Sequence, residues 1–81
     1  MLLSELPLNS SAVITKLYTN NALRLRLQEL GFIEGAKVKC LLKSPLGEPT
    51  AYKICDSIIA LRKPEADSIE ILGGENIGTH I

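Results

Sequence analysis

Apolar and polar residues alternate in three stretches of the chain, which is the pattern of a half-buried β-strand. These stretches cover residues 11–18, 36–43 and 50–55. Two shorter apolar runs, at residues 58–62 and 68–72, predict two further strands. The pattern also predicts the side chains that face the core, which are Ala12, Ile14, Val38, Cys40, Leu42, Tyr52, Ile54, Ile59, Leu61, Ile69 and Ile71.

Two of these strands carry predictions that depend on register. In the first strand, Leu17 joins the core face with Ala12 and Ile14 if a bulge or a twist intervenes. In the second strand, strict alternation turns the lysine side chains toward solvent, and these are Lys37, Lys39 and Lys43.

Residues 20–30 follow a helical period instead. Asn20 or Asn21 can serve as the N-cap, because an asparagine side chain accepts a hydrogen bond from a free backbone N–H. Gly31 fits the left-handed position after the helix, and Phe32 can fold back as its apolar partner. The leucines that share one helical face are Leu23, Leu27 and Leu30.

The remaining segments predict turns. Ser4 can cap a short turn that Pro7 ends, and the sequence SPLGEP at residues 44–49 predicts a loop. Residues 63–67 break the fourth strand, with a single helical turn starting after Pro64, and residues 73–81 are expected to form a flexible tail.

Together these elements predict one mostly β domain at residues 1–72, a small closed or nearly closed barrel of about five strands with one α-helix. We expect the helix to plug an open side of this barrel. Two glycines with positive φ, Gly31 and Gly35, would then turn the chain from the helix into the barrel wall.

Composition and charge narrow the function. Nine basic residues balance nine acidic ones and interleave with them, which argues against binding nucleic acid or a membrane surface by charge. No apolar run approaches the roughly 20 residues that span a bilayer, and the N-terminus lacks the features of a signal peptide. The sequence therefore predicts a cytosolic protein.

The residues give no catalytic constellation, and we expect no metal or cofactor. His80 is the single histidine, and Cys40 and Cys55 lack the spacing of a metal site. Reduced thiols are expected, with Cys40 in the core and Cys55 partly exposed beside a turn. Glu65 and Asp67 are read as a solvated turn, so a binding or regulatory module is the expected class.

Two leucines have no evident role in the core. Leu25 lies opposite the buried face of the helix, and Leu46 lies at the tip of the loop at residues 44–49. Single exposed leucines are common in soluble proteins, but two together point to a partner surface. Arg26, beside Leu25, is the kind of residue that anchors interfaces. The predicted partner-binding residues are therefore Leu25, Arg26 and Leu46.

The chain resembles the ferrous iron transport protein A family, the FeoA-like domains, over nearly its whole length up to residue 72. Residues 23–71 carry most of this resemblance, and Leu3, Leu6 and residues 12–14 match more loosely. The resemblance depends on the order and spacing of several pieces rather than on one motif: Leu23, Arg26, Leu27 and Leu30 before Gly31, then Gly35, the loop Ser44–Pro49, the run Ile59–Arg62, and finally Ala66 and Ile69. Three positions depart from the family pattern. Asn9 and Asp56 replace glycines but tolerate left-handed geometry, and Glu34 replaces a proline.

The resemblance implies an SH3-like barrel and an accessory protein of bacterial ferrous iron uptake. It further implies action by contact with the cytosolic GTP-binding part of a FeoB-type membrane transporter, without catalysis. One alternative is the SH3-like C-terminal module of metal-dependent repressors, although the sequence shows no DNA-binding domain and begins with its own Met. A second is a small metal carrier that uses Cys40, Cys55 and His80.

Overall fold

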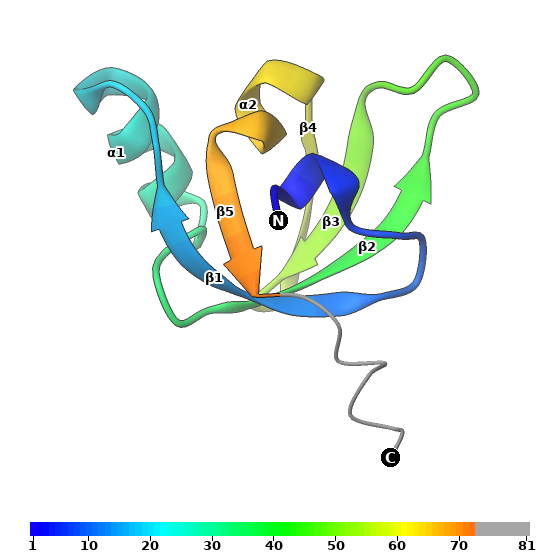
Figure 1. Ribbon diagram of the computed structural model, residues 1–81, viewed down its shortest axis with the longest axis horizontal. Coiled ribbons are helices and arrows are strands. Elements are labelled where there is room, and N and C mark those ends of the chain that lie inside the picture. The colour runs from blue at the N-terminus through cyan, green and yellow to red at the C-terminus, as the bar shows by residue number, and fades with distance from the viewer. Residues whose placement is uncertain (73–81) are drawn as a thin grey trace.

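A computed structural model of the chain describes residues 1–72 and shows one curled antiparallel sheet with three short helical segments (Figure 1). The strands pair in the order β4-β3-β2-β1-β5, which confirms the mostly β prediction. The expected tail at residues 73–81 lies outside the described residues. The elements along the chain are η1 (Leu3–Glu5), β1 (Ser11–Leu17), α1 (Asn21–Glu29), β2 (Lys37–Lys43), β3 (Thr50–Ile54), β4 (Ser57–Leu61), α2 (Lys63–Asp67) and β5 (Ile69–Leu72).

The register of β1 follows the prediction. β1 pairs with β5 through Ile14–Ile71 and Leu17–Ile69, and the register shifts between Ile14 and Lys16. This irregularity places Leu17 on the same face as Ile14, and both side chains are buried. The bulge that Leu17 required is therefore confirmed.

The register of β2 corrects the prediction. A second irregularity, between Cys40 and Leu42, reverses the faces at the end of the strand. Leu42, expected in the core, is 64% exposed. Lys43, expected on the outer face, instead pairs with the buried Thr50 and lines a small hollow on the inner side of the sheet. Periodicity alone could not reveal the bulge, because both registers keep an apolar residue on each face.

Helix α1 begins and ends as its sequence predicts. The Asn20 side chain accepts a hydrogen bond from the Leu23 backbone N–H at 2.9 Å, so Asn20 is the N-cap. At the other end, the N–H of Gly31 donates to the Gln28 carbonyl, and the N–H of Phe32 donates to the Leu27 carbonyl. Gly31 has φ +108°, and these two bonds form a Schellman motif that directs the buried Phe32 into the core.

The open side of the barrel, between the edges β4 and β5, is covered by two other segments. They are η1 with the following Leu6, and α2, and we refer to them together as the lid (Figure 1). Leu3, Leu6 and Ala66 of the lid are fully or almost fully buried. The backbone at Leu2 continues the sheet through a bridge to Glu70 of β5.

The prediction that α1 plugs the barrel therefore needs correction. On the predicted face of α1 only Leu27 is fully buried, while Leu23 and Leu30 are partly buried against the core. The helix lies at one end of the molecule and does not enter the opening that the lid covers (Figure 1).

Several turns place a residue at positive φ, and three of these residues bear on the sequence predictions. Gly35 has φ +91° as predicted, and Asn9 adopts φ +68°, which fits its replacement of a family glycine. In the β3–β4 turn, Cys55 takes the left-handed conformation with φ +55°, whereas the sequence comparison placed that requirement at Asp56. The Ile54–Ser57 pair closes a two-residue turn, and the first of its two residues, Cys55, takes the positive φ.

Candidate protein-binding surface

The structure leaves both predicted leucines exposed. Leu25 is 58% exposed on the outer face of α1, and Leu46 is 93% exposed in the loop between β2 and β3. Neither side chain belongs to the hydrophobic core. Both side chains remain in contact with water in the free chain. Burying either of them against a partner would therefore contribute favourable free energy to binding.

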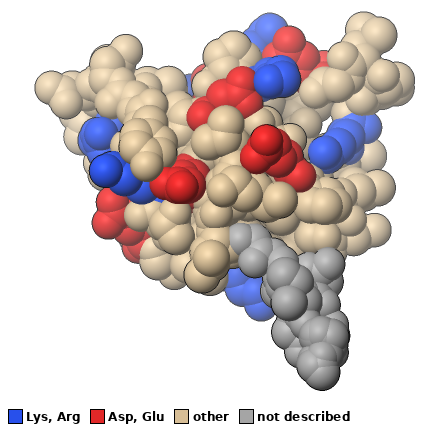
Figure 2. Space-filling model, in the orientation of Figure 1, with Lys and Arg blue, Asp and Glu red and all other residues tan. Residues whose placement is uncertain are grey.

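The two leucines do not form one compact patch. Helix α1 and the β2–β3 loop lie at opposite ends of the long axis, with α2 of the lid between them (Figure 1). The space-filling view shows largely uncharged surface at both ends and charged side chains of both signs between them (Figure 2). A single partner that contacts both leucines must therefore extend across the lid.

Arg26 connects α1 to the lid. Its guanidinium forms an ion pair with the Glu65 carboxylate of α2, with 2.7 Å between Arg26 Nη1 and Glu65 Oε2. Glu65 Oε1 also accepts a hydrogen bond from the Arg62 backbone N–H at the start of α2. Exposed pairs of this kind typically contribute about 0.2–1 kcal/mol to stability. Arg26 therefore positions the helix against α2, and no sequence pattern indicated its partner 39 residues away.

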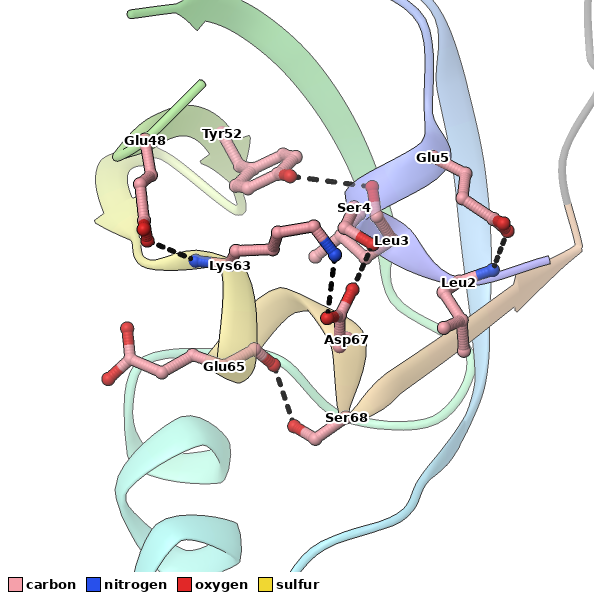
Figure 3. Close-up of polar contacts among 10 residues, drawn as sticks. All are labelled: Leu2, Leu3, Ser4, Glu5, Glu48, Tyr52, Lys63, Glu65, Asp67 and Ser68. Atoms are coloured by element: carbon pink, nitrogen blue, oxygen red, sulfur yellow. Dashed lines mark hydrogen bonds and ion pairs between the residues drawn. The ribbon is translucent and has the colours of Figure 1, made fainter. Parts of the chain in front are cut away.

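The β2–β3 loop is held at its base. The Ser44 hydroxyl donates to the Pro49 carbonyl at 2.8 Å, and the Gly47 N–H donates to the Ser44 carbonyl at 2.9 Å. Glu48 accepts a hydrogen bond from the backbone N–H of Lys63 in α2, at 2.9 Å (Figure 3). The loop thus presents Leu46 from a fixed base, which lowers the entropy lost when a partner binds.

Polar contacts also fix the two halves of the lid to each other (Figure 3). The Ser4 hydroxyl donates to the Asp67 carboxylate, and the Lys63 ammonium lies 3.0 Å from the same carboxylate. The bond from Ser4, followed by that from Lys63, holds the pKa of Asp67 below its usual value. The Ser4 side chain, expected to cap a turn, therefore joins segments 63 residues apart.

Beneath the lid, Tyr52 is almost fully buried, and its hydroxyl donates to the Leu3 carbonyl at 3.4 Å. Burial raises the pKa of Tyr52 to about 12, because the charged phenolate would lose its hydration. The hydroxyl therefore stays protonated and acts as a donor inside the barrel.

The two cysteines are separate free thiols. Cys40 is buried in the core, as predicted, and burial raises the pKa of its thiol. Cys55 is exposed. Within residues 1–72, no group of three or more His, Cys, Asp or Glu side chains is arranged to hold a metal ion. His80, the third residue of the metal-carrier alternative, lies outside the described residues. No helix within the same range is long and apolar enough to cross a bilayer.

Comparison with known proteins identifies the domain. The family model described as FeoA domain matches residues 1–72. A curated relative from Porphyromonas gingivalis, named Fe(2+) transport protein A/Fe(2+) transporter FeoB fusion protein, is 35% identical over 71 residues. That match covers 88% of this chain and 8% of the fusion protein, so the chain spans less than a tenth of this relative's length.

Solved structures agree with this assignment. FeoA from Stenotrophomonas maltophilia, crystallised with zinc and described as a prokaryotic SH3 domain protein, is 39% identical, with a TM-score of 0.78. The match covers 89% of each chain. FeoA from Chlorobium tepidum is 35% identical, with a TM-score of 0.85 over 91% of this chain and 70% of that one. The expected SH3-like fold is thus confirmed.

One further likeness bears on the repressor alternative. A manganese-dependent transcriptional repressor shares the fold with a TM-score of 0.81 but only 11% identity, and the match covers 41% of that chain. Identity this low shows a common fold and carries no argument about function.

Proposed function

Because the chain belongs to the FeoA family, we propose that it is a small accessory protein of bacterial ferrous iron uptake. It binds the cytosolic GTP-binding part of a FeoB-type membrane transporter and acts by that contact on the cytosolic side, without catalysing a reaction. The observation that carries the proposal is the relative in which Fe(2+) transport protein A and FeoB are fused. Fusion raises the effective concentration of two partners that work together.

The proposed contact surface combines Leu25 on α1 with Leu46 on the β2–β3 loop, and Arg26 beside them. Both leucines are exposed apolar side chains without a core role, and both project from elements attached to α2 by polar contacts. A partner that spans the lid would remove both leucines from water, and the hydrogen-bonded base of the loop lowers the cost of ordering Leu46.

The two alternatives have weaker support. The likeness to the repressor is a likeness of fold alone. A carrier that uses both thiols would have to bring the buried Cys40 and the exposed Cys55 to one ion, and Cys40 packs in the hydrophobic core. Contact with the transporter remains the function that the observations support best.

The experiment compares charge substitutions at the proposed surface with a matched control. The variants are Leu25→Glu, Leu46→Glu and both together. The control is Ile58→Glu, because the exposure of Ile58, 68%, lies between those of the two leucines, and Ile58 lies on β4. The affinity of each variant is measured by binding to the immobilised cytosolic part of the transporter. Thermal unfolding then shows whether each variant is folded.

We expect all four variants to stay folded. Each single substitution at the surface should weaken capture about tenfold, the double variant should weaken it further, and Ile58→Glu should bind like the parent. Unchanged affinity of the folded double variant would overturn the proposed surface. Failure of the parent chain to bind the transporter at all would overturn the proposed function itself.

A further inference from the structure

Three lysines gather on the outer face of the sheet, away from the lid. Lys37 and Lys39 are two positions apart on β2 and so point to the same side, and Lys39 lies directly opposite Lys53 of β3. All three are exposed. With Ser11, Ala36 and Cys55 they line a groove of about 490 Å³, which we call the lysine groove.

None of the three groove lysines forms an ion pair with a carboxylate within residues 1–72. The ion pairs in this part of the chain, Arg26–Glu65 and Lys63–Asp67, both involve the lid. Like charges directly opposite each other on neighbouring strands destabilise a sheet. The chain as a whole has no net charge, so this local excess of positive charge reflects placement rather than composition.

We propose that the lysine groove binds an acidic segment of a protein partner in an extended conformation. In an extended chain, alternate side chains lie on one side and repeat at roughly 6.6–6.8 Å, which is also the spacing of alternate residues along β2. Carboxylates at alternate positions would thus meet Lys37 and Lys39 in register, and Lys53 would flank them. This site is separate from the surface formed by Leu25 and Leu46, and it does not depend on the proposed function.

Other anionic ligands fit the groove less well. The lining residues of the groove include neither arginine, whose planar fork suits phosphate, nor an aromatic side chain on which a nucleobase could stack. Polybasic attachment to anionic lipid usually involves about four to eight basic residues on a protruding surface, whereas here three lysines line a depression. Three lysines that line a groove therefore favour a narrow ligand, such as an extended acidic peptide.

The test uses an end-blocked octapeptide that alternates glutamate and threonine, titrated into the full chain at low salt and followed by calorimetry. The control peptide has glutamine in place of glutamate. The groove variant combines Lys37→Gln, Lys39→Gln and Lys53→Gln. The matched variant, with the same change of net charge elsewhere, combines Lys16→Gln, Lys43→Gln and Lys63→Gln.

We expect the glutamate peptide to bind, the affinity to fall as salt is added, and the groove variant to bind about tenfold more weakly. The matched variant should stay within about threefold of the parent, and the glutamine peptide should not bind. The groove variant should unfold at the same temperature as the parent or higher, because it removes the repulsion between Lys39 and Lys53. The double variant Leu25→Glu, Leu46→Glu should keep the parent affinity for this peptide.

Three results would overturn the proposal. Equal losses in the groove and matched variants would show that only net charge matters, and absence of binding by the parent would remove the site. Sedimentation with phosphatidylserine vesicles provides the third test. Vesicle binding that requires the groove lysines, without binding of the glutamate peptide, would assign the groove to a lipid surface instead.

Discussion

Helix α1 has regular local structure but little burial in the core, whereas the lid has little regular structure and is well buried. The helix has nine residues, a side-chain N-cap and a Schellman end, yet it buries one side chain completely, that of Leu27. The lid consists of shorter segments, but it buries Leu3, Leu6 and Ala66. The lid is also crosslinked by the contacts of Ser4, Lys63 and Asp67, and it covers the Tyr52 hydroxyl.

The difference teaches that regular local structure and integration into the core are separate properties. An isolated helix of this length is marginal in water. To stay in place, α1 therefore depends on the burial of Leu27, on the partial burial of Leu23 and Leu30, and on the Arg26–Glu65 pair. The lid has little regular structure but many long-range contacts. A weakly anchored helix that exposes Leu25 is suited to contacting a partner, whereas the lid is suited to holding the barrel together.

Removing the buried leucines should have the largest effects. We expect Leu3→Ala in the lid and Leu27→Ala in α1 each to lower the free energy of unfolding by about 2–5 kcal/mol, because each leaves a cavity in the core. Leu23→Ala should cost clearly less than Leu27→Ala, and Leu25→Ala less again. Urea unfolding of the four variants provides the measurement. If Leu23→Ala cost as much as Leu27→Ala, the picture of a helix held by a single buried leucine would be wrong.

Two glycines in the connection between α1 and β2 sharpen the comparison at a smaller scale. A side chain at Gly31 would meet both a positive φ and close neighbours, with Cys55 Sγ at 3.3 Å and Ile54 Cγ1 at 3.4 Å from the added Cβ. At Gly35 the φ is also positive, but the space around it is open. We expect Gly35→Ala to cost about 1–2 kcal/mol from backbone strain alone.

Gly31→Ala should cost more than Gly35→Ala, and Gly31→Val should be the most damaging of the three, because β-branched residues resist positive φ most strongly. The same urea experiment measures all three variants. Equal costs at Gly31 and Gly35 would mean that contact with the β3–β4 turn does not help to fix the end of α1.

The Tyr52 hydroxyl beneath the lid should make the free energy of unfolding depend on pH in the alkaline range. The pKa of Tyr52 is raised to about 12 in the fold, above its unfolded value of 10.0, so the stability due to the protonated hydroxyl is complete below pH 10. It should fall as the pH rises through about 12. Comparing urea midpoints between pH 9 and 12 for the parent and Tyr52→Phe tests this. An equally steep loss in Tyr52→Phe would assign the alkaline transition to other groups.

Much of this architecture could be predicted from local patterns. The Asn20 cap, the Gly31 end and the bulge that places Leu17 in the core follow from short-range rules, and so does the exposure of Leu25 and Leu46. The β2 bulge at Leu42 could not be predicted, because either register satisfies the alternation. The lid also could not, because the Ser4–Asp67 contact joins the two ends of the domain and neither residue indicates its partner.

The candidate surface, too, could be predicted only in part. The sequence indicated which side chains are exposed, but not that α2 separates them or that Arg26 is paired with Glu65. The placement of Lys43 on the inner side, away from Lys37 and Lys39, was also hidden by the β2 bulge. In each case the missing information is a contact between residues distant in sequence.

Amide hydrogen exchange of the full chain, with and without excess cytosolic part of the transporter, tests the central claim most directly. In the free chain, amides of α1 should exchange faster than those of β1 and β3, because the helix is held by one fully buried side chain. In the complex, exchange should slow in α1 and at Leu46 and Glu48 of the loop. A complex that forms while exchange in both α1 and the loop stays unchanged would contradict the account.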